Sequence, residues 1–142
     1  MTLRRYLTKK LGNKKTITAC LKFMLQKSFY SKSFREFWKH WNPLWSYFLT
    51  YYSYKPLKTK LPKSIAVLLT FGISGALHDV FVMLLLQKFY YLFTMIFLVF
   101  GALVLVESSL KISITSSSKV LRPIYHSTII ILCTVTIKYF YS

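Results

Sequence analysis

The hydrophobic and polar residues of this chain are separated into long blocks, and its second half is mostly apolar. Three apolar runs lie at residues 64–87, 89–106 and 124–140, and a loop rich in Ser and Lys at 107–123 precedes the third. As a helix the first run is about 36 Å long, which exceeds the roughly 30 Å hydrocarbon core of a membrane. The pattern therefore predicts a transmembrane region at 64–142 with three membrane-spanning helices.

Residues 1–63 have a different pattern, in which basic side chains are interspersed with short apolar and aromatic groups. The segment 17–30 places Lys22 and Lys27 apart from its apolar face. It is too short and too charged to span a membrane, so we predict an interfacial amphipathic helix there. The whole pattern predicts an all-α integral membrane protein in which basic, aromatic-rich interfacial helices precede about three transmembrane helices.

Large aromatic residues recur at three- and four-residue steps within this N-terminal region, which predicts an aromatic stripe along a helix. Ser33 and Glu36 have the spacing of a helix capping box. Pro43 disfavours helix for the residue before it, so we predict a restart with Asn42 as N-cap. Trp and Tyr beside Lys are typical of a membrane–water interface, where we expect the stripe to lie. Its members are Phe34, Phe37, Trp38, Trp41, Trp45 and Phe48.

Composition and charge add partners and an orientation. Hydrophobic residues make up 54% of the chain, and 20 Lys and Arg stand against 3 Asp and Glu, a net charge of +17. Such an excess suits nucleic acid or an anionic membrane surface. Because it leads directly into apolar spans and no nucleic-acid motif is present, we expect membrane lipids and no nucleic acid as partners. The distribution of Lys and Arg predicts that residues 1–63 and the 107–123 loop are cytoplasmic, with the C-terminus on the opposite side.

Two polar residues, His78 and Asp79, fall near the middle of the first span, where polar groups are costly and usually functional. Burial disfavours a charged imidazole, so we expect a neutral His78 that accepts a proton as a general base does. Ser74 and Gly75 share its helical face and are small, which leaves room for a substrate or another helix. The alternative is a histidine that hydrogen-bonds a neighbouring helix. Asp79 points about 100° away, so we expect it to contact another helix or backbone.

The other candidate side chains have structural interpretations. Asn42 is well suited to begin a helix, and His40 and His126 are expected at the membrane interface. Cys20 and Cys133 lack the spacing of a metal site and are interpreted as small buried hydrophobes. We expect no metal and no bound cofactor.

Two stretches taken together resemble the membrane-bound O-acyltransferase family. The first is Ser-Phe-Arg-Glu-Phe-Trp-Lys-His-Trp-Asn-Pro at residues 33–43, followed by Tyr-Lys-Pro-Leu at 54–57. It is similar to the Phe-Trp-x-x-Trp-Asn and Tyr-x-Pro pattern of the wax-ester, diacylglycerol and sterol acyltransferase branches. The second is Ser-Gly-Ala-Leu-His-Asp at 74–79, which resembles the segment that holds the family's intramembrane histidine.

The resemblance implies an enzyme that transfers an acyl group from a thioester, acyl-CoA or an acyl-carrier protein, to a hydroxyl of a lipid or saccharide. The family's histidine corresponds to His78, expected as general base. The Asn or His of its other motif corresponds to Asn42, expected to position or polarise a reactant. The expected substrate contacts are Trp38, Trp41, Ser74 and Gly75.

Family members have many more spans, and this chain resembles their C-terminal portion. We therefore expect missing N-terminal spans or another subunit to complete the reaction chamber. The alternative is a non-catalytic membrane protein or subunit that binds anionic lipid or a membrane partner through its basic region.

Overall fold

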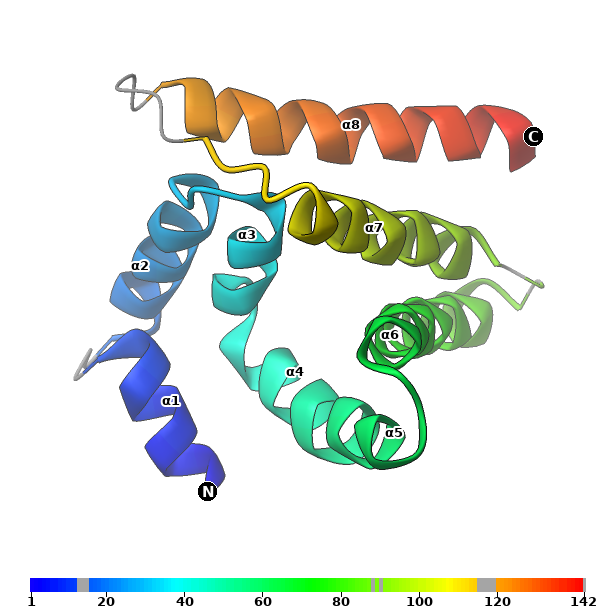
Figure 1. The fold of residues 1–142 in the computed structure, drawn as a ribbon. Coiled ribbons are helices and arrows are strands. Elements are labelled where there is room, and N and C mark those ends of the chain that lie inside the picture. The colour runs from blue at the N-terminus through cyan, green and yellow to red at the C-terminus, as the bar shows by residue number, and fades with distance from the viewer. Residues whose placement is uncertain (13–15, 88, 90, 115–119, 142) are drawn as a thin grey trace.

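A computed structural model of the chain describes all residues except 13–15, 88, 90, 115–119 and 142, and the described residues form helices and no strand. The helices are α1 (Leu3–Leu11), α2 (Ile17–Phe29), α3 (Phe34–His40), α4 (Pro43–Phe48), the π-helix η1 (Leu49–Tyr54), α5 (Lys55–Lys60), α6 (Lys63–Leu86), α7 (Leu92–Ser109) and α8 (Leu121–Tyr141). The long helices α6, α7 and α8 lie one beside the next, and α2 and α3 lie at the end where α7 finishes and α8 begins (Figure 1).

Among the described residues, three helices are long and apolar enough to cross a membrane: Lys63–Leu86, Leu92–Ser109 and Leu121–Phe140. The prediction of an all-α integral membrane protein is thereby confirmed. The predicted helix ends differ from the observed ones by a few residues. Glu107 and Ser109 belong to α7 and Leu121 already to α8, so the connection is shorter than the predicted 107–123 loop, of which residues 115–119 lie outside the described part.

The spans α6 and α7 pack closely because α6 has a glycine where the two helices approach each other. A Cβ on Gly75 would lie only 2.6 Å from the carbonyl oxygen of Phe93 and from Cα of Thr94. One turn further along α6, Asp79 is buried and accepts hydrogen bonds from the backbone N–H groups of Phe93 at 2.8 Å and Thr94 at 2.7 Å. Asp79 therefore contacts the backbone of another helix, as predicted, and holds the first turn of α7 against α6.

The opposite end of α7 is joined to α3 by a second carboxylate. Glu107 is buried and accepts hydrogen bonds from the backbone N–H groups of Phe34 at 2.8 Å and Arg35 at 2.9 Å. These N–H groups belong to the first turn of α3, which has no intrahelical partner for them. A carboxylate is favourable at such a helix N-terminus, so Glu107 fixes where α3 begins.

Part of the aromatic stripe, which was expected at the membrane interface, is buried in the protein core. Phe34 and Phe37 are each 1% exposed and pack with Phe100 of α7. His126 was also expected at the interface, but it is 0% exposed, and its Nε2 lies 3.1 Å from both the hydroxyl and the carbonyl oxygen of Ser31. The periodicity identified the apolar face correctly, and the residues that cover it come from α2, α6, α7 and α8.

The segment from α4 to α5 has the predicted start and an unpredicted widening. Asn42 has a left-handed φ of 38° and caps α4, with Pro43 in its first turn, as the sequence predicted. Along the continuous run from α4 to α5, Pro56 has no N–H to donate to the carbonyl of Tyr52, and its ring crowds that carbonyl. The chain forms the wider π-helix η1 just before this proline. Such widenings are uncommon and often lie at functional sites.

Candidate functional site

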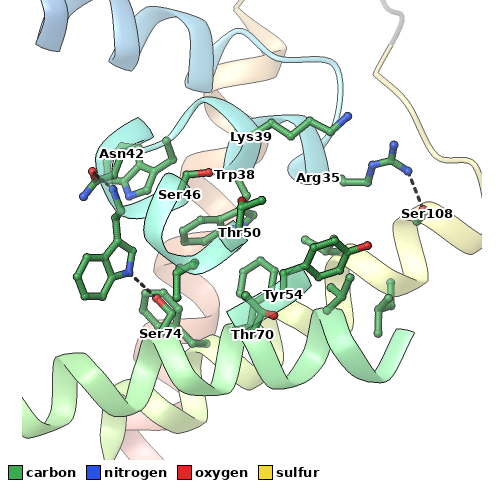
Figure 2. A pocket seen from close by; sticks show the side chains of 18 of the residues that line it. Arg35, Trp38, Lys39, Asn42, Ser46, Thr50, Tyr54, Thr70, Ser74 and Ser108 are labelled. Carbon is green, nitrogen blue, oxygen red and sulfur yellow. Dashed lines mark hydrogen bonds between the residues drawn. The ribbon is translucent and has the colours of Figure 1, made fainter. Parts of the chain in front are cut away.

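A cavity of about 400 Å³ lies between the aromatic N-terminal helices and the first two spans (Figure 2). Its walls come from α3, α4, η1, α6 and α7, and no residue of α8 lines it. All three tryptophans of the chain, Trp38, Trp41 and Trp45, are among its lining residues. The volume is within the range of sites that bind small molecules.

Five of the six residues expected at the site line this cavity. His78 and Ser74 reach it from α6, and Asn42, Trp38 and Trp41 from α3 and the turn that follows it. The structure thus brings together the two sequence stretches that carried the family resemblance.

Gly75, the sixth expected residue, is not among the residues that line the cavity. It packs instead against the backbone of Phe93 and Thr94. The sequence left open whether the space beside this small residue holds a substrate or another helix, and in the structure the first turn of α7 fills it.

The His78 ring is held in one tautomer by its own helix. Its Nδ1 lies 2.6 Å from the carbonyl oxygen of Ser74. A carbonyl oxygen only accepts hydrogen bonds, so Nδ1 carries the proton and Nε2 of the neutral ring keeps its lone pair. Among the described residues Nε2 has no hydrogen-bond partner. A neutral histidine of this kind can accept a proton from a molecule in the cavity.

Aromatic rings surround His78 on several sides. The ring centroid of Phe97 is 5.0 Å away in a stacked arrangement, and that of Phe93 is 5.8 Å away. Trp45 contacts the His78 ring edge-on, with centroids 5.7 Å apart and an interplanar angle of 79°. These rings restrict the rotation of the imidazole and shield it from water.

Trp45 also makes the polar contact that links the two motifs. Its indole N–H donates to the hydroxyl of Ser74 at 2.9 Å, as Figure 2 shows by the dashed line that ends at Ser74. The periodicity had placed Trp45 on the aromatic stripe but had not indicated a role at the site. The sequence contains one signal for this role of Trp45. It lies three residues after Asn42, which places both residues on the same side of a short helix.

Asn42 uses its side chain to begin α4. Its Oδ1 accepts a hydrogen bond from the backbone N–H of Trp45 at 3.1 Å, while the residue itself stays exposed at the edge of the cavity. The interpretation of Asn42 as a helix cap is therefore confirmed. The amide NH₂ has no partner among the described residues.

The cavity is positively charged at one side. Arg35, Lys39 and Lys63 line it and are exposed, and Figure 2 shows Arg35 and Lys39 on α3, across the pocket from Ser74 on α6. Arg35 donates to the hydroxyl of Ser108 at 3.0 Å. None of these three cations pairs with a carboxylate in the described part of the chain.

The side chains of all three Asp and Glu residues instead accept hydrogen bonds from backbone N–H groups at or beside the start of a helix. Asp79 and Glu107 do so at α7 and α3, and Glu36 accepts from the backbone N–H of Lys32 at 3.1 Å. The Ser33 hydroxyl completes the start of α3 by accepting from the Glu36 N–H at 3.1 Å.

Hydroxyl groups line the part of the cavity near η1. Thr50 and Tyr54 come from the π-helix, Ser46 from α4 and Thr70 from α6 (Figure 2). Tyr54 opens the Tyr-x-Pro stretch, so that motif reaches the same cavity as Asn42 and the His78 segment. The π-helix was not predicted from the sequence.

His40 lies outside the cavity, half-buried against α1 and α2. Burial lowers the pKa of His40 below its ordinary value of 6.5, and the neighbouring Lys10 and Lys27 lower it further. Lys10 reaches this place because its ammonium group donates to the carbonyl oxygen of Lys39 at 2.8 Å, at the end of α3.

Comparison with known proteins gives one family match. The family model MBOAT, the membrane-bound O-acyltransferase family, matches residues 16–135. These residues include every residue that lines the cavity. Neither the curated proteins nor the solved structures gave a match.

Proposed function

The chain belongs to the membrane-bound O-acyltransferase family, and from this premise we propose that it transfers an acyl group from a thioester to a hydroxyl acceptor in the cavity beside His78. The observation that carries the proposal is the hydrogen bond between His78 Nδ1 and the Ser74 carbonyl oxygen at 2.6 Å. It leaves Nε2 at the wall of the cavity, with no hydrogen-bond partner among the described residues.

In the proposed reaction Nε2 of His78 accepts the proton of the acceptor hydroxyl while that oxygen attacks the thioester carbonyl. The C–S bond then breaks, and the leaving thiolate takes the proton back from the imidazolium. An ester and a free thiol result, and the histidine returns to its starting state. General-base assistance of this kind is typically worth about 10²–10⁴-fold in rate. We expect the surrounding aromatic rings to favour transfer over hydrolysis, because they leave less room for water beside the reacting atoms.

We propose that the donor is a thioester on a phosphate-bearing arm, as in acyl-CoA or an acyl-carrier protein. Arg35, Lys39 and Lys63 support this, since they line the cavity with positive charge and pair with no carboxylate of the described residues. Arg and Lys side chains are the usual partners of phosphate groups. The donor phosphates would lie at these cations, with the thioester reaching inward to His78.

We propose a lipid alcohol as acceptor, in line with the wax-ester, diacylglycerol and sterol branches that the motifs resemble. The tryptophan, phenylalanine and valine side chains that line the cavity favour an apolar acceptor over a saccharide. Trp38 and Trp41 would contact its hydrocarbon part. A comparison of a long-chain alcohol and a sugar as acceptors tests this, and faster transfer to the sugar would contradict it.

For orientation we propose that the N-terminal part and the α7–α8 connection are cytoplasmic. The two are held together at one end of the helices, since the backbone N–H of Ile114 donates to the Lys32 carbonyl at 2.7 Å. Single cysteines at Thr8, Ser109 and Gln87 in a chain without Cys20 and Cys133 test the topology. Labelling of Gln87 from the same side as the other two would contradict it.

We further propose that additional helices, from an N-terminal portion or another subunit, complete the wall of the chamber. The support is that no described side chain of α8 lines the cavity, so of the described spans only α6 and α7 contribute to its wall. Acyl transfer that appears only when such spans are co-expressed would support this proposal, and full activity of the purified chain would contradict it.

The test of the catalytic assignment is His78→Ala in the complemented protein. We expect acyl transfer to fall by about 10²–10⁴-fold, with insertion and protein level unchanged. His40→Gln is the matched control, because His40 lies outside the cavity, and it should keep full activity. Full activity of His78→Ala would leave His78 with a structural role only.

A second candidate function is a non-catalytic subunit that binds anionic lipid. The observation that favours it is the excess of 20 Lys and Arg over three carboxylates, all of which are used by helix backbones. In that case the complemented wild-type protein would bind vesicles that contain anionic lipid, and it would show no acyl transfer.

A further inference from the structure

We propose that Trp45 is a positioning residue for His78 and that Asn42 acts through it, without contacting the substrate. This inference rests on the proposed function of His78 as a general base. It replaces the role that the family resemblance implied for Asn42, which was to position or polarise a reactant. Three contacts in series connect Asn42 to the imidazole.

The first contact fixes the start of α4. The Oδ1 of Asn42 accepts from the backbone N–H of Trp45 at 3.1 Å, and the left-handed φ of 38° directs the chain from α3 into α4. Asn is one of the few residues that adopt this conformation readily. The side chain and the backbone conformation of Asn42 together determine the position of the Trp45 backbone, from which the indole extends.

The second contact joins α4 to α6. The indole N–H of Trp45 donates to the Ser74 hydroxyl at 2.9 Å, and Ser74 is only 2% exposed. A buried hydroxyl has no water to replace this partner, so loss of the hydrogen bond is costly. The bond spans 29 residues of sequence and places the edge of the indole against His78.

The third contact holds the imidazole itself. The Ser74 carbonyl accepts from Nδ1 of His78 at 2.6 Å, and Phe97 stacks on the ring with centroids 5.0 Å apart. Trp45 contacts the same ring edge-on. Rotation of the imidazole would break the hydrogen bond and move the ring into Trp45 or Phe97. Nε2 therefore keeps its place at the cavity only while Trp45 keeps its own.

Two single variants remove the same hydrogen bond from opposite sides. Trp45→Phe removes the N–H and keeps an aromatic ring, and Ser74→Ala removes the acceptor hydroxyl and keeps the carbonyl that binds His78. We expect each to lower kcat about fivefold to tenfold with KM unchanged, in line with the net value of one hydrogen bond. The double variant should lose no more than either single variant, because both act on one interaction.

The structural readout is the imidazole ¹⁵N resonance of His78 in histidine-labelled protein, identified by its absence in His78→Gln. In the wild type it should report a protonated Nδ1 and a bare Nε2. In Trp45→Phe and in Ser74→Ala it should move toward a mixture of the two tautomers. Trp38→Phe is the matched control, because the Trp38 indole N–H is buried without a hydrogen-bond partner, and it should leave this resonance unmoved.

Asn42 is tested by a pair of substitutions. Asn42→Asp keeps an acceptor for the Trp45 N–H and tolerates the left-handed backbone, but it loses the amide NH₂. Asn42→Ala loses the acceptor for the Trp45 N–H and does not readily adopt the left-handed backbone conformation. We expect Asn42→Asp to retain the His78 resonance and most of the kcat, and Asn42→Ala to lose both. Equal loss of kcat in the two variants with an unmoved resonance would show that the NH₂ acts on a reactant, and would overturn the assignment of Asn42.

The outcomes separate this inference from the proposed function. An unmoved His78 resonance in both Trp45→Phe and Ser74→Ala would overturn the positioning role, whatever the activity. A moved resonance together with full acyl transfer by His78→Ala would leave the positioning role intact and overturn the general-base assignment.

Discussion

Replacing Gly75 by alanine tests how closely the first two spans are packed. The added Cβ would lie 2.6 Å from the Phe93 carbonyl oxygen and from Cα of Thr94. Both atoms belong to the backbone of α7, so neither can be moved by rotation of a side chain. Ordinary van der Waals contact begins at 3.4 Å. The helices must therefore separate locally by roughly 0.8 Å, which is the difference between 3.4 and 2.6 Å.

The cost of this separation has two parts. Overpacking of this kind typically costs about 1–3 kcal/mol. The same movement stretches the hydrogen bonds from Phe93 and Thr94 to Asp79, which are 2.8 and 2.7 Å long. Hydrogen bonds to charged groups contribute about 1.5–3 kcal/mol each, and stretching by this amount forfeits only a part of that. We expect a total loss of about 3 kcal/mol in the free energy of unfolding.

Gly72→Ala is the matched control on the same helix. Among the described residues its Cβ would meet the side chain of Leu98, with Cδ2 at 3.1 Å and Cγ at 3.7 Å, and this side chain can rotate away. Both substitutions gain helix propensity of about 1 kcal/mol, so the difference between them isolates the clash with α7. Unfolding in mixed detergent micelles, followed by circular dichroism, measures both. Equal stabilities of the two variants would refute the packing argument, and a raised KM without loss of stability would restore Gly75 as a substrate contact.

Two further predictions concern charged groups. Asp79→Ala should destabilise the chain by about 3 kcal/mol because it leaves buried N–H groups at the start of α7 unpaired. Asp79→Asn should cost about half as much, because one acceptor oxygen remains. Equal losses for the two variants in the same unfolding assay would exclude the capping role of Asp79. Burial and, after it, Lys10 and Lys27 lower the pKa of His40 below 6.5, so the folded chain binds fewer protons than the unfolded chain and loses stability as the pH falls from 6.5 through the lowered pKa. The Tm of the wild type should therefore drop more steeply between about pH 7.5 and 5 than that of His40→Gln, and parallel curves would contradict this.

The spans and their approximate ends were predictable because length and hydropathy alone determine whether a helix can cross a membrane. The capping residues Ser33 and Asn42 were also predictable, since each caps a backbone N–H only three residues away. Such short-range chemistry is visible in a sequence. The residues at the cavity were predicted through the family motifs, which place His78 and Asn42 together without stating how they touch.

The contacts that the sequence did not predict join residues that are far apart along the chain. The Glu107 carboxylate binds N–H groups 72 and 73 residues away, and His126 contacts Ser31 across 95 residues. The sequence analysis placed Glu107 in a loop and expected His126 at the membrane interface. Neither contact could be predicted, because periodicity does not indicate which helix covers a given face. The link between Trp45 and Ser74 was missed for the same reason.

The position of α7 connects these polar contacts to the proposed chemistry. Asp79 fixes the start of α7 and Glu107 fixes the start of α3 against its end. Between these points α7 supplies Phe97, which stacks on His78 and also contacts Trp38. Carboxylates are expensive inside a membrane unless their hydrogen bonds are satisfied. Asp79 and Glu107 hold α7 in place, and the orientation of the His78 ring depends on the position of α7. The two buried acids therefore act on the proposed site through this helix.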